Sequence, residues 1–225
     1  MNSKPATSYI SQFLILIGLV VAGFVIAAVI TLILMQLMIG NVFNSELMKK
    51  EMLNPANSNA LKVVQLVSSF VLFFIPAVIF ARIMNRDPLK HLGIRTRFSW
   101  MQAGLVLIIV FLGFTLSGAL GELTSQIPIP SDWEAYFKKL EKQFADSVMV
   151  MANMQSTGDY LFTLFVIAIA PAIFEEVLFR GALQQVMVKW TRNVWIGIII
   201  TSILFSIVHF SYYGFLSRVA LGMVL

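Results

Sequence analysis

Long apolar runs separated by short polar segments dominate the pattern of this chain. A helix needs about 20 mostly apolar residues to cross the hydrocarbon core of a bilayer. Five runs reach that length: residues 10–40, 61–84, 99–120, 160–190 and 194–213. A sixth begins near Phe215 and holds only eleven residues up to Leu225, so we expect it to be truncated. The pattern therefore predicts an all-α, polytopic membrane helix bundle with five complete spanning helices, in a single transmembrane domain over residues 1–225.

One polar segment, the loop 121–159, contains a helix signal of a different kind. Ser131 and Glu134 follow Pro130 with the spacing of a capping box, which marks a helix start. Apolar residues then recur every three or four positions: Trp133, Phe137, Leu140, Phe144, Val148 and Met151. We predict an extramembrane amphipathic helix over residues 131–156, on the membrane surface or over the bundle. Such a helix is either a packing element with no further role or a lid over a site.

Composition agrees with a membrane protein and excludes other classes. Hydrophobic residues make up 59% of the 225 positions and charged residues 12%, against about 25% charged residues in soluble domains. The run 10–40 is longer than the roughly 7–15 apolar residues of a cleaved signal peptide, so we expect it to remain as the first span. Because the chain has no cysteine, disulfides and thiolate metal ligands are excluded.

The basic residues indicate an orientation in the membrane. The formal net charge is +5, but the lysines and arginines lie in short loops between apolar runs, which argues against nucleic acid as a partner. The loop 82–98 is the most basic, and we place it in the cytoplasm. A multi-pass cell-membrane protein with a cytoplasmic N-terminus follows, with the loops 41–60 and 121–159 outside. The lysines that then lie outside, against the bias, are Lys49, Lys50, Lys138, Lys139 and Lys142.

Three ionisable residues, Glu175, Glu176 and Arg180, interrupt the fourth apolar run. Each costs about 2.5–3.5 kcal/mol at the bilayer centre, so such residues face a protein interior or a wet cavity. Glu176 and Arg180 are four apart on one helix face, in the favourable order for an ion pair. Glu175 lies about 100° around the helix from Glu176, which leaves it for other chemistry such as general-base catalysis. The alternative is a buried charge network that only holds helices together.

His209 lies in the next apolar run. The turn between the two runs is centred near Arg192, seventeen residues from Glu175 and seventeen from His209. In an antiparallel hairpin both side chains then lie at one depth, roughly 25 Å from the turn. Together they could polarise a water molecule or act as two ligands of a divalent metal such as zinc. A core histidine without a further role is the alternative. Pro171, one turn before Glu175, indicates either a hydrated pocket or a plain packing kink.

The two motifs resemble those of a known family. Glu-Glu-x-x-x-Arg at 175–180, followed by Phe-x-x-x-His at 205–209 on the next run, is similar to the first two motifs of the CAAX prenyl protease and bacteriocin-processing family, also called CPBP, Abi or type II CAAX. Members of this family are multi-pass helical intramembrane peptidases. Its eukaryotic branch trims the last three residues after a prenylated cysteine, and bacterial members include bacteriocin-immunity and maturation proteins.

The resemblance implies roles for residues of this chain. Glu175 matches the residue that activates the hydrolytic water, and Glu176 and Arg180 match supporting residues. His209 matches a water- or metal-binding residue, and the implied metalloprotease site would use Glu175 and His209 as ligands. The implied partners are membrane lipid and a membrane-associated, lipidated or bacteriocin-type peptide.

A further family motif is not found. In the family, a histidine followed four residues on by Asn or Asp lies on a later helix, and no such pair occurs up to Leu225. His91 is the other histidine of the chain, and we interpret it as a loop residue. A metal site needs about three protein ligands, so we expect the motif region 175–209 to hold an incomplete set and the chain to be C-terminally incomplete.

Three functions remain open from the sequence. The first is an intramembrane endopeptidase with Glu175 as general base and His209 on the water or metal. The second is a non-catalytic immunity or scaffold protein of the same fold, for which Glu175 and His209 would be dispensable. The third is an ion- or proton-coupled transporter, since intramembrane acids and histidines also occur there. The chain lacks the paired broken helices that many transporters carry in two related halves.

Overall fold

The computed structural model describes residues 7–85, 87–88, 92–93 and 99–224, and all regular structure in these ranges is helical. Four helices are long and apolar enough to cross a membrane: Tyr9–Met38, Pro55–Met84, Trp100–Ser125 and Thr157–Thr191. Two shorter apolar helices follow, α11 (Val194–Ile207) and α12 (Phe215–Val224). The expected all-helical, multi-pass membrane architecture is confirmed. The expected count of five complete spans is not confirmed, because the fifth run forms a helix of only 14 residues.

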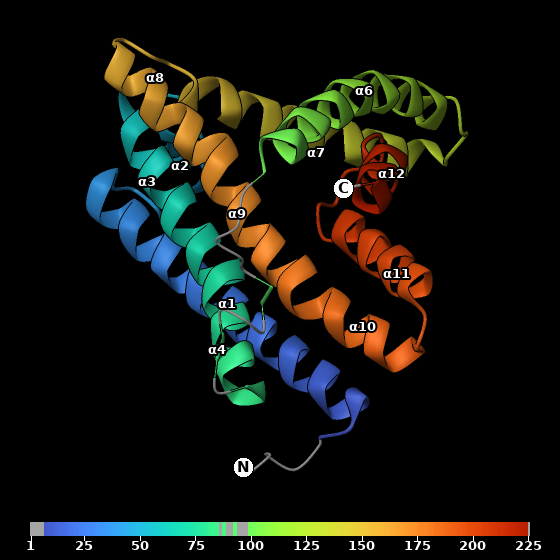
Figure 1. Ribbon diagram of the computed structural model, residues 1–225. Helices are drawn as coiled ribbons and strands as arrows, with labels where there is room; N and C mark the ends of the chain where they lie inside the picture. The colour runs from blue at the N-terminus through green and yellow to red at the C-terminus, as the bar shows by residue number, and fades with distance from the viewer. Residues whose placement is uncertain (1–6, 86, 89–91, 94–98, 225) are drawn as a thin grey trace.

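The first two long helices pack along each other (Figure 1). α1 is Tyr9–Met38. Its neighbour is one continuous helix whose parts are η1 (Pro55–Asn57), α3 (Ser58–Ser69), η2 (Phe70–Phe74) and α4 (Ile75–Met84). A Cβ atom added to Gly23 of α1 would lie 2.8 Å from Pro76 Cγ and 3.2 Å from the carbonyl oxygen of Val71. Glycine is therefore required at position 23 for this close approach.

The fourth apolar run is one helix of 35 residues, Thr157–Thr191. Its parts are α8 (Thr157–Leu164), η3 (Phe165–Ile169), α9 (Ala170–Glu176), η4 (Val177–Leu183) and α10 (Gln184–Thr191). Both η3 and η4 are π-helical. Pro171 has no N–H, so the carbonyl of Ile167 lacks its usual helical donor and the helix widens into a π turn there. The irregularity expected at Pro171 is thus a π segment. The π segment η2 likewise comes directly before a helix that has a proline, Pro76, in its first turn.

α10 and α11 form the expected antiparallel hairpin. Arg192 takes the left-handed conformation, with φ of 54°, and Asn193 caps α11 by accepting backbone N–H groups of its first turn. A Cβ atom on Gly197 would lie 2.4 Å from Val188 Cγ2 and 2.8 Å from Val188 N. The two helices therefore touch backbone to backbone near the turn, and this contact sets how their far ends face each other.

Two buried clusters hold the long helices together. The larger one joins α1, α4, η4 and α10, and its members include Leu16, Ala77, Phe80, Leu178, Ala182 and Met187. The smaller one lies at the other end of α1, where α3 and the end of α7 meet it, and comprises Met35, Val42, Leu61, Val64, Val150 and Met151. By contrast, most large apolar side chains of the third long helix are exposed, as in Phe111 (71%) and Phe114 (80%). Such a surface suits contact with lipid.

The loop before the fourth long helix contains the expected amphipathic helix, which begins at the expected residue and ends earlier. α6 (Trp100–Ser125) is followed by α7 (Ser131–Met151), which ends before the expected residue 156. The expected capping box does not form, because Pro130 occupies the N-cap and Ser131 is already helical. Glu134 instead pairs with Lys138, one turn further on, at 2.6 Å. Ser156 is needed to cap α8, where its hydroxyl accepts the N–H of Asp159.

The basic loop expected at 82–98 lies largely outside the described residues. Arg82 is described, at the end of α4. The other members of the loop's basic set, Arg86, Lys90, Arg95 and Arg97, fall outside, as does His91. The short helix α2 (Ser45–Met52) in the loop 41–60 was not expected from the sequence.

Candidate active site

The acidic motif lies where α9 passes into the π-helical η4. Arg180 Nη1 donates to Glu176 Oε1, so the ion pair expected from the four-residue spacing is confirmed. Glu175 does not take part in it. The Glu175 side chain is 21% exposed and that of Glu176 is 53% exposed. The two neighbouring carboxylates thus differ: one is neutralised by an arginine and half open, and the other lies in a more enclosed place.

His209 lies in a turn, and this corrects the helix expected over 194–213. α11 ends at Ile207, and the next N–H groups bond back over three residues, from His209 N to Ser206 O (3.3 Å) and from Phe210 N to Ile207 O (3.1 Å). Phe210 takes a left-handed conformation with φ of 48°, which reverses the chain before α12 begins. His209 is therefore presented by the end of a turn and not by a helix face.

Glu175 and His209 nevertheless meet. The distance from Glu175 Oε1 to His209 Nε2 is 3.9 Å, and the two side chains are 21% and 29% exposed. The expected proximity of these residues is confirmed. The helix hairpin brings the two chain segments together, and the turn after α11 places His209 next to Glu175. A separation of 3.9 Å is too long for a direct hydrogen bond and short enough for both atoms to contact one small molecule.

A backbone hydrogen bond fixes the imidazole. His209 Nδ1 lies 2.7 Å from the carbonyl oxygen of Phe205, one helical turn earlier. A carbonyl oxygen only accepts, so Nδ1 carries the hydrogen and Nε2 of the neutral ring presents a lone pair to Glu175. The ring also packs on Phe205 at a centroid distance of 4.6 Å, and Phe205 in turn packs edge-on against Phe179 at 5.0 Å. The second motif thus orients its own histidine through its phenylalanine.

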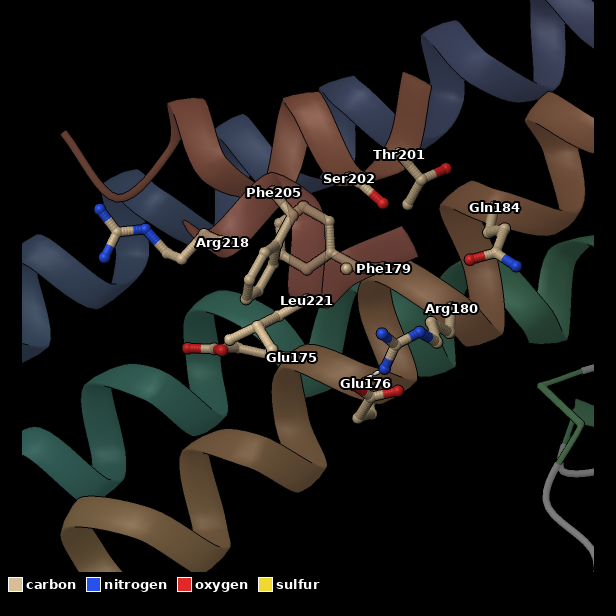
Figure 2. Close-up of a pocket in the computed structure, with 11 residues that line it drawn as sticks. Glu175, Glu176, Phe179, Arg180, Gln184, Thr201, Ser202, Phe205, Arg218 and Leu221 are labelled. Carbon is tan, nitrogen blue, oxygen red and sulfur yellow. Dashed lines mark hydrogen bonds and ion pairs between the residues drawn. The ribbon is translucent and has the colours of Figure 1, made fainter. Parts of the chain in front are cut away.

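A cavity of about 230 Å³ lies beside the acidic motif (Figure 2). The long helix, α11 and α12 each contribute to its lining, which is Glu175, Glu176, Phe179, Arg180, Gln184, Thr201, Ser202, Phe205, Arg218, Leu221 and Gly222. A second cavity of about 450 Å³ lies between α7 and the His209 turn, lined by Leu140, Glu141, Phe144, His209, Phe210, Ser211 and Arg218. Arg218 lines both cavities, one with Glu175 and the other with His209.

The amphipathic helix α7 contacts the turn that carries His209. The Ser211 hydroxyl donates to Glu141 Oε1 at 2.8 Å, and the rings of Phe137 and Tyr212 stack at 5.5 Å. The Tyr212 hydroxyl also donates to the carbonyl oxygen of Ile127, just before α7, at 3.2 Å. These contacts place α7 over the second cavity, a position in keeping with either role considered for it, packing or lid.

Arg218 is the site residue that sequence reasoning missed. Its Nη2 donates to the carbonyl oxygen of Ser211 at 3.0 Å, while its Nε is buried without a hydrogen-bond partner. The signal was available, because Arg218 interrupts the apolar run after Phe215, just as the acidic motif interrupts the fourth run. A charged residue in such a run is a functional candidate by the same argument.

The described residues do not provide a complete zinc site. Glu175 and His209 are close enough to be two ligands, but among the residues that the structure describes no three His, Cys, Asp or Glu side chains gather around one point. A structural or catalytic zinc needs about three protein ligands. Glu175 and His209 would be two ligands of the metal that the family resemblance implies, and the described residues supply no third.

The C-terminal third of the chain matches a family model. Residues 157–225 match the model described as type II CAAX prenyl endopeptidase Rce1-like. The matched segment contains the acidic motif, His209 and Arg218. Searches among curated proteins and among solved structures give no match.

Proposed function

Residues 157–225 match the type II CAAX prenyl endopeptidase Rce1-like family model, and on that premise we propose that the chain hydrolyses a peptide bond within or at the membrane. The proposed substrate is a membrane-associated or lipidated peptide of the CAAX kind, or a bacteriocin-type peptide. One observation carries the proposal: a carboxylate on the long helix and an imidazole nitrogen in the turn after α11 lie 3.9 Å apart beside a cavity in a membrane helix bundle.

The geometry of the pair supports binding of a nucleophilic water. Glu175 as a carboxylate only accepts hydrogen bonds, and His209 Nε2 also accepts because Nδ1 holds the ring hydrogen. Two acceptors 3.9 Å apart suit one water molecule, which donates one O–H to each. The lone pairs of that water then point away from both side chains, toward a substrate carbonyl in the cavity.

The proposed reaction uses Glu175 as general base and then as general acid. The water oxygen forms a bond to the carbonyl carbon, its proton passes to Glu175, and the C=O π pair moves onto the carbonyl oxygen as an oxyanion. When the oxyanion re-forms the C=O bond, the C–N bond breaks and the nitrogen takes the proton from Glu175. The products are a carboxylic acid and an amine. General acid–base catalysis of this kind contributes about 10²–10⁴-fold.

The supporting roles follow from the contacts. Glu176 and Arg180 pair on the side of the helix next to Glu175, so the guanidinium neutralises Glu176 and leaves Glu175 to the water. His209 holds the second O–H of the water and fixes its orientation. The scheme routes no step through a metal, because the described residues offer two ligands where about three are required.

The proposed orientation keeps the N-terminus in the cytoplasm, on the basis of the Lys/Arg distribution. Because the chain lacks cysteine, single cysteines report topology without background. Lys50→Cys should react with a membrane-impermeant maleimide added to intact cells, and Lys189→Cys should react only after the cells are opened. The reverse pattern would contradict the orientation and leave the peptidase proposal untouched.

The test of the proposed function is hydrolysis by purified protein in liposomes. The substrates are quenched fluorescent peptides with a farnesylated cysteine before the last three residues, and matched peptides without lipid. Glu175→Gln keeps the shape of the side chain and removes the base, so we expect at least a 10²-fold fall in kcat. Glu122→Gln, an exposed acid on α6, is the matched control and should retain the rate. Full activity of Glu175→Gln would rule out Glu175 as base, and a lack of hydrolysis by the unmodified protein would favour a non-catalytic protein.

A further inference from the structure

The proposed reaction generates an oxyanion, and the two residues on the water do not stabilise it. Glu175 is an acceptor, and neutral His209 has its one N–H directed at the carbonyl of Phe205, 2.7 Å away. An oxyanion in a low-dielectric site needs preorganised donors, and loss of one such donor costs about 10²–10³-fold in kcat. A hydrogen-bond donor that lines a cavity beside Glu175 or His209 is therefore a candidate for this role.

Arg218 forms no ion pair within 4 Å among the described residues, and the acid that attracts its charge is Glu141, which lines the second cavity with it. The other arginine of the first cavity, Arg180, is by contrast paired with Glu176. One Nη of Arg218 donates to the Ser211 carbonyl, and Nε is buried without an acceptor. An unsatisfied buried donor costs about 1–3 kcal/mol, so its retention calls for an explanation.

The two cavities bring Arg218 near both members of the pair. Arg218 lines the cavity that contains Glu175 and also the cavity that contains His209. Figure 2 shows Arg218 and Glu175 toward one end of the first cavity, with Arg180, Gln184 and Thr201 toward the other end. The guanidinium lies over the backbone of Gly214, where a Cβ atom would be 2.6 Å from both Nη atoms.

We propose that Arg218 is a catalytic residue that donates to the oxyanion formed from the scissile carbonyl. This rests on the proposed peptidase function. The C=O π pair moves onto the carbonyl oxygen as the water attacks, and the guanidinium N–H groups not used by Ser211 bind the resulting charge. No proton is transferred to or from Arg218, because a guanidinium stays protonated throughout.

Two variants and one inhibitor test the proposal in the liposome assay. Arg218→Met removes the charge, and Gly214→Ala displaces the guanidinium with the charge kept, since the added Cβ meets the flexible end of a side chain. For Arg218→Met we expect a fall in kcat of about 10²–10³-fold, with KM changed less than about threefold. A smaller fall in kcat is expected for Gly214→Ala. The exposed Arg82→Met, on α4 and outside both cavity linings, is the matched control.

A phosphinate peptide analogue distinguishes oxyanion binding from structural support of the turn. Its tetrahedral anion mimics the intermediate, so in both variants its Ki should rise by the same factor by which kcat/KM falls. If Arg218→Met does not fold, Gly214→Ala alone decides by this criterion. An unchanged kcat, an increase in KM only, or a constant Ki with a lower kcat overturns the proposal. Hydrolysis by the unmodified protein separates the two hypotheses, because its absence would remove the peptidase function itself, whereas an active enzyme with unaffected Arg218→Met and Gly214→Ala variants would remove only the role of Arg218.

Discussion

Glu175 lies on a helix of 35 residues whose neighbouring turns are buried against α1 and α4. By contrast, His209 lies in the turn that joins α11, a helix of 14 residues, to α12, a helix of 10 residues that contains Arg218. We call the side of the site that carries Glu175 the first wall and the side that carries His209 and Arg218 the second wall. The first wall is held by a core that includes fully buried Phe80 and Ala182. The second is held by hydrogen bonds to backbone carbonyls and by the amphipathic helix α7. The base is therefore placed by a rigid bundle, and its partners by a smaller, polar arrangement that is easier to perturb.

The sharpest test of this division is whether the two walls act as one unit. His209→Gln should lower kcat by about 10²–10⁴-fold, because the water loses the basic imidazole nitrogen that the Phe205 carbonyl holds in place. Glu175→Gln combined with His209→Gln should cost no more than the worse single change, as for residues that share one step. Steady-state kinetics of the four proteins measures this, with His91→Gln as control. Losses that multiply would mean that the two residues act independently.

The hairpin contact at Gly197 joins the two walls, so it should affect both stability and rate. Gly197→Ala places a Cβ 2.4 Å from Val188 Cγ2 and 2.9 Å from Val188 Cα, and the helices must separate. We expect a loss of about 1–3 kcal/mol in stability, seen as a lower Tm in detergent, together with a lower kcat. Gly118→Ala on α6, where nothing lies within 4 Å of the added Cβ, should keep both. A normal kcat in a destabilised Gly197→Ala would show that the hairpin does not set the Glu175–His209 distance.

The same contrast explains how far the sequence could be interpreted. The first wall was predictable, because the long apolar runs, the Glu176–Arg180 spacing and Pro171 each have a local physical meaning within one helix. The second was not, because aromatic residues continue through the turn and hide it from hydropathy. Phe210 takes a left-handed conformation without being glycine, although Ser211 and Gly214 are turn-favouring residues close by. Arg218 was missed for a different reason, since its run was interpreted as the start of a span although the charge that interrupts the run is visible in the sequence.

The contacts of α7 should contribute less than the hairpin, because they act on the turn from outside. Phe137→Ala removes the stacking on Tyr212, and an aromatic pair of this kind is worth about 0.5–1.5 kcal/mol. If α7 positions the His209 turn, kcat falls by up to about tenfold and limited proteolysis of the 208–214 segment becomes faster. Met149→Ala, on the same helix with a side chain 78% exposed, is the control. An increase in kcat would instead identify α7 as a lid that restricts access to the second cavity.

A bound metal would make the two sides of the site depend on each other, because it would join them through direct bonds to Glu175 and His209. The described residues supply those two ligands and no third, and the 3.9 Å separation suits a shared water without further movement. The proposed water-activation scheme uses no metal, so on that scheme treatment with EDTA and 1,10-phenanthroline leaves kcat/KM unchanged, and added zinc does not raise it. The measurement is the initial rate of peptide hydrolysis before and after chelation, with metal content determined in the same samples. A rate that is lost on chelation and restored by zinc would show that the two walls are bridged by a metal, and His209 would then be its ligand rather than an acceptor for water.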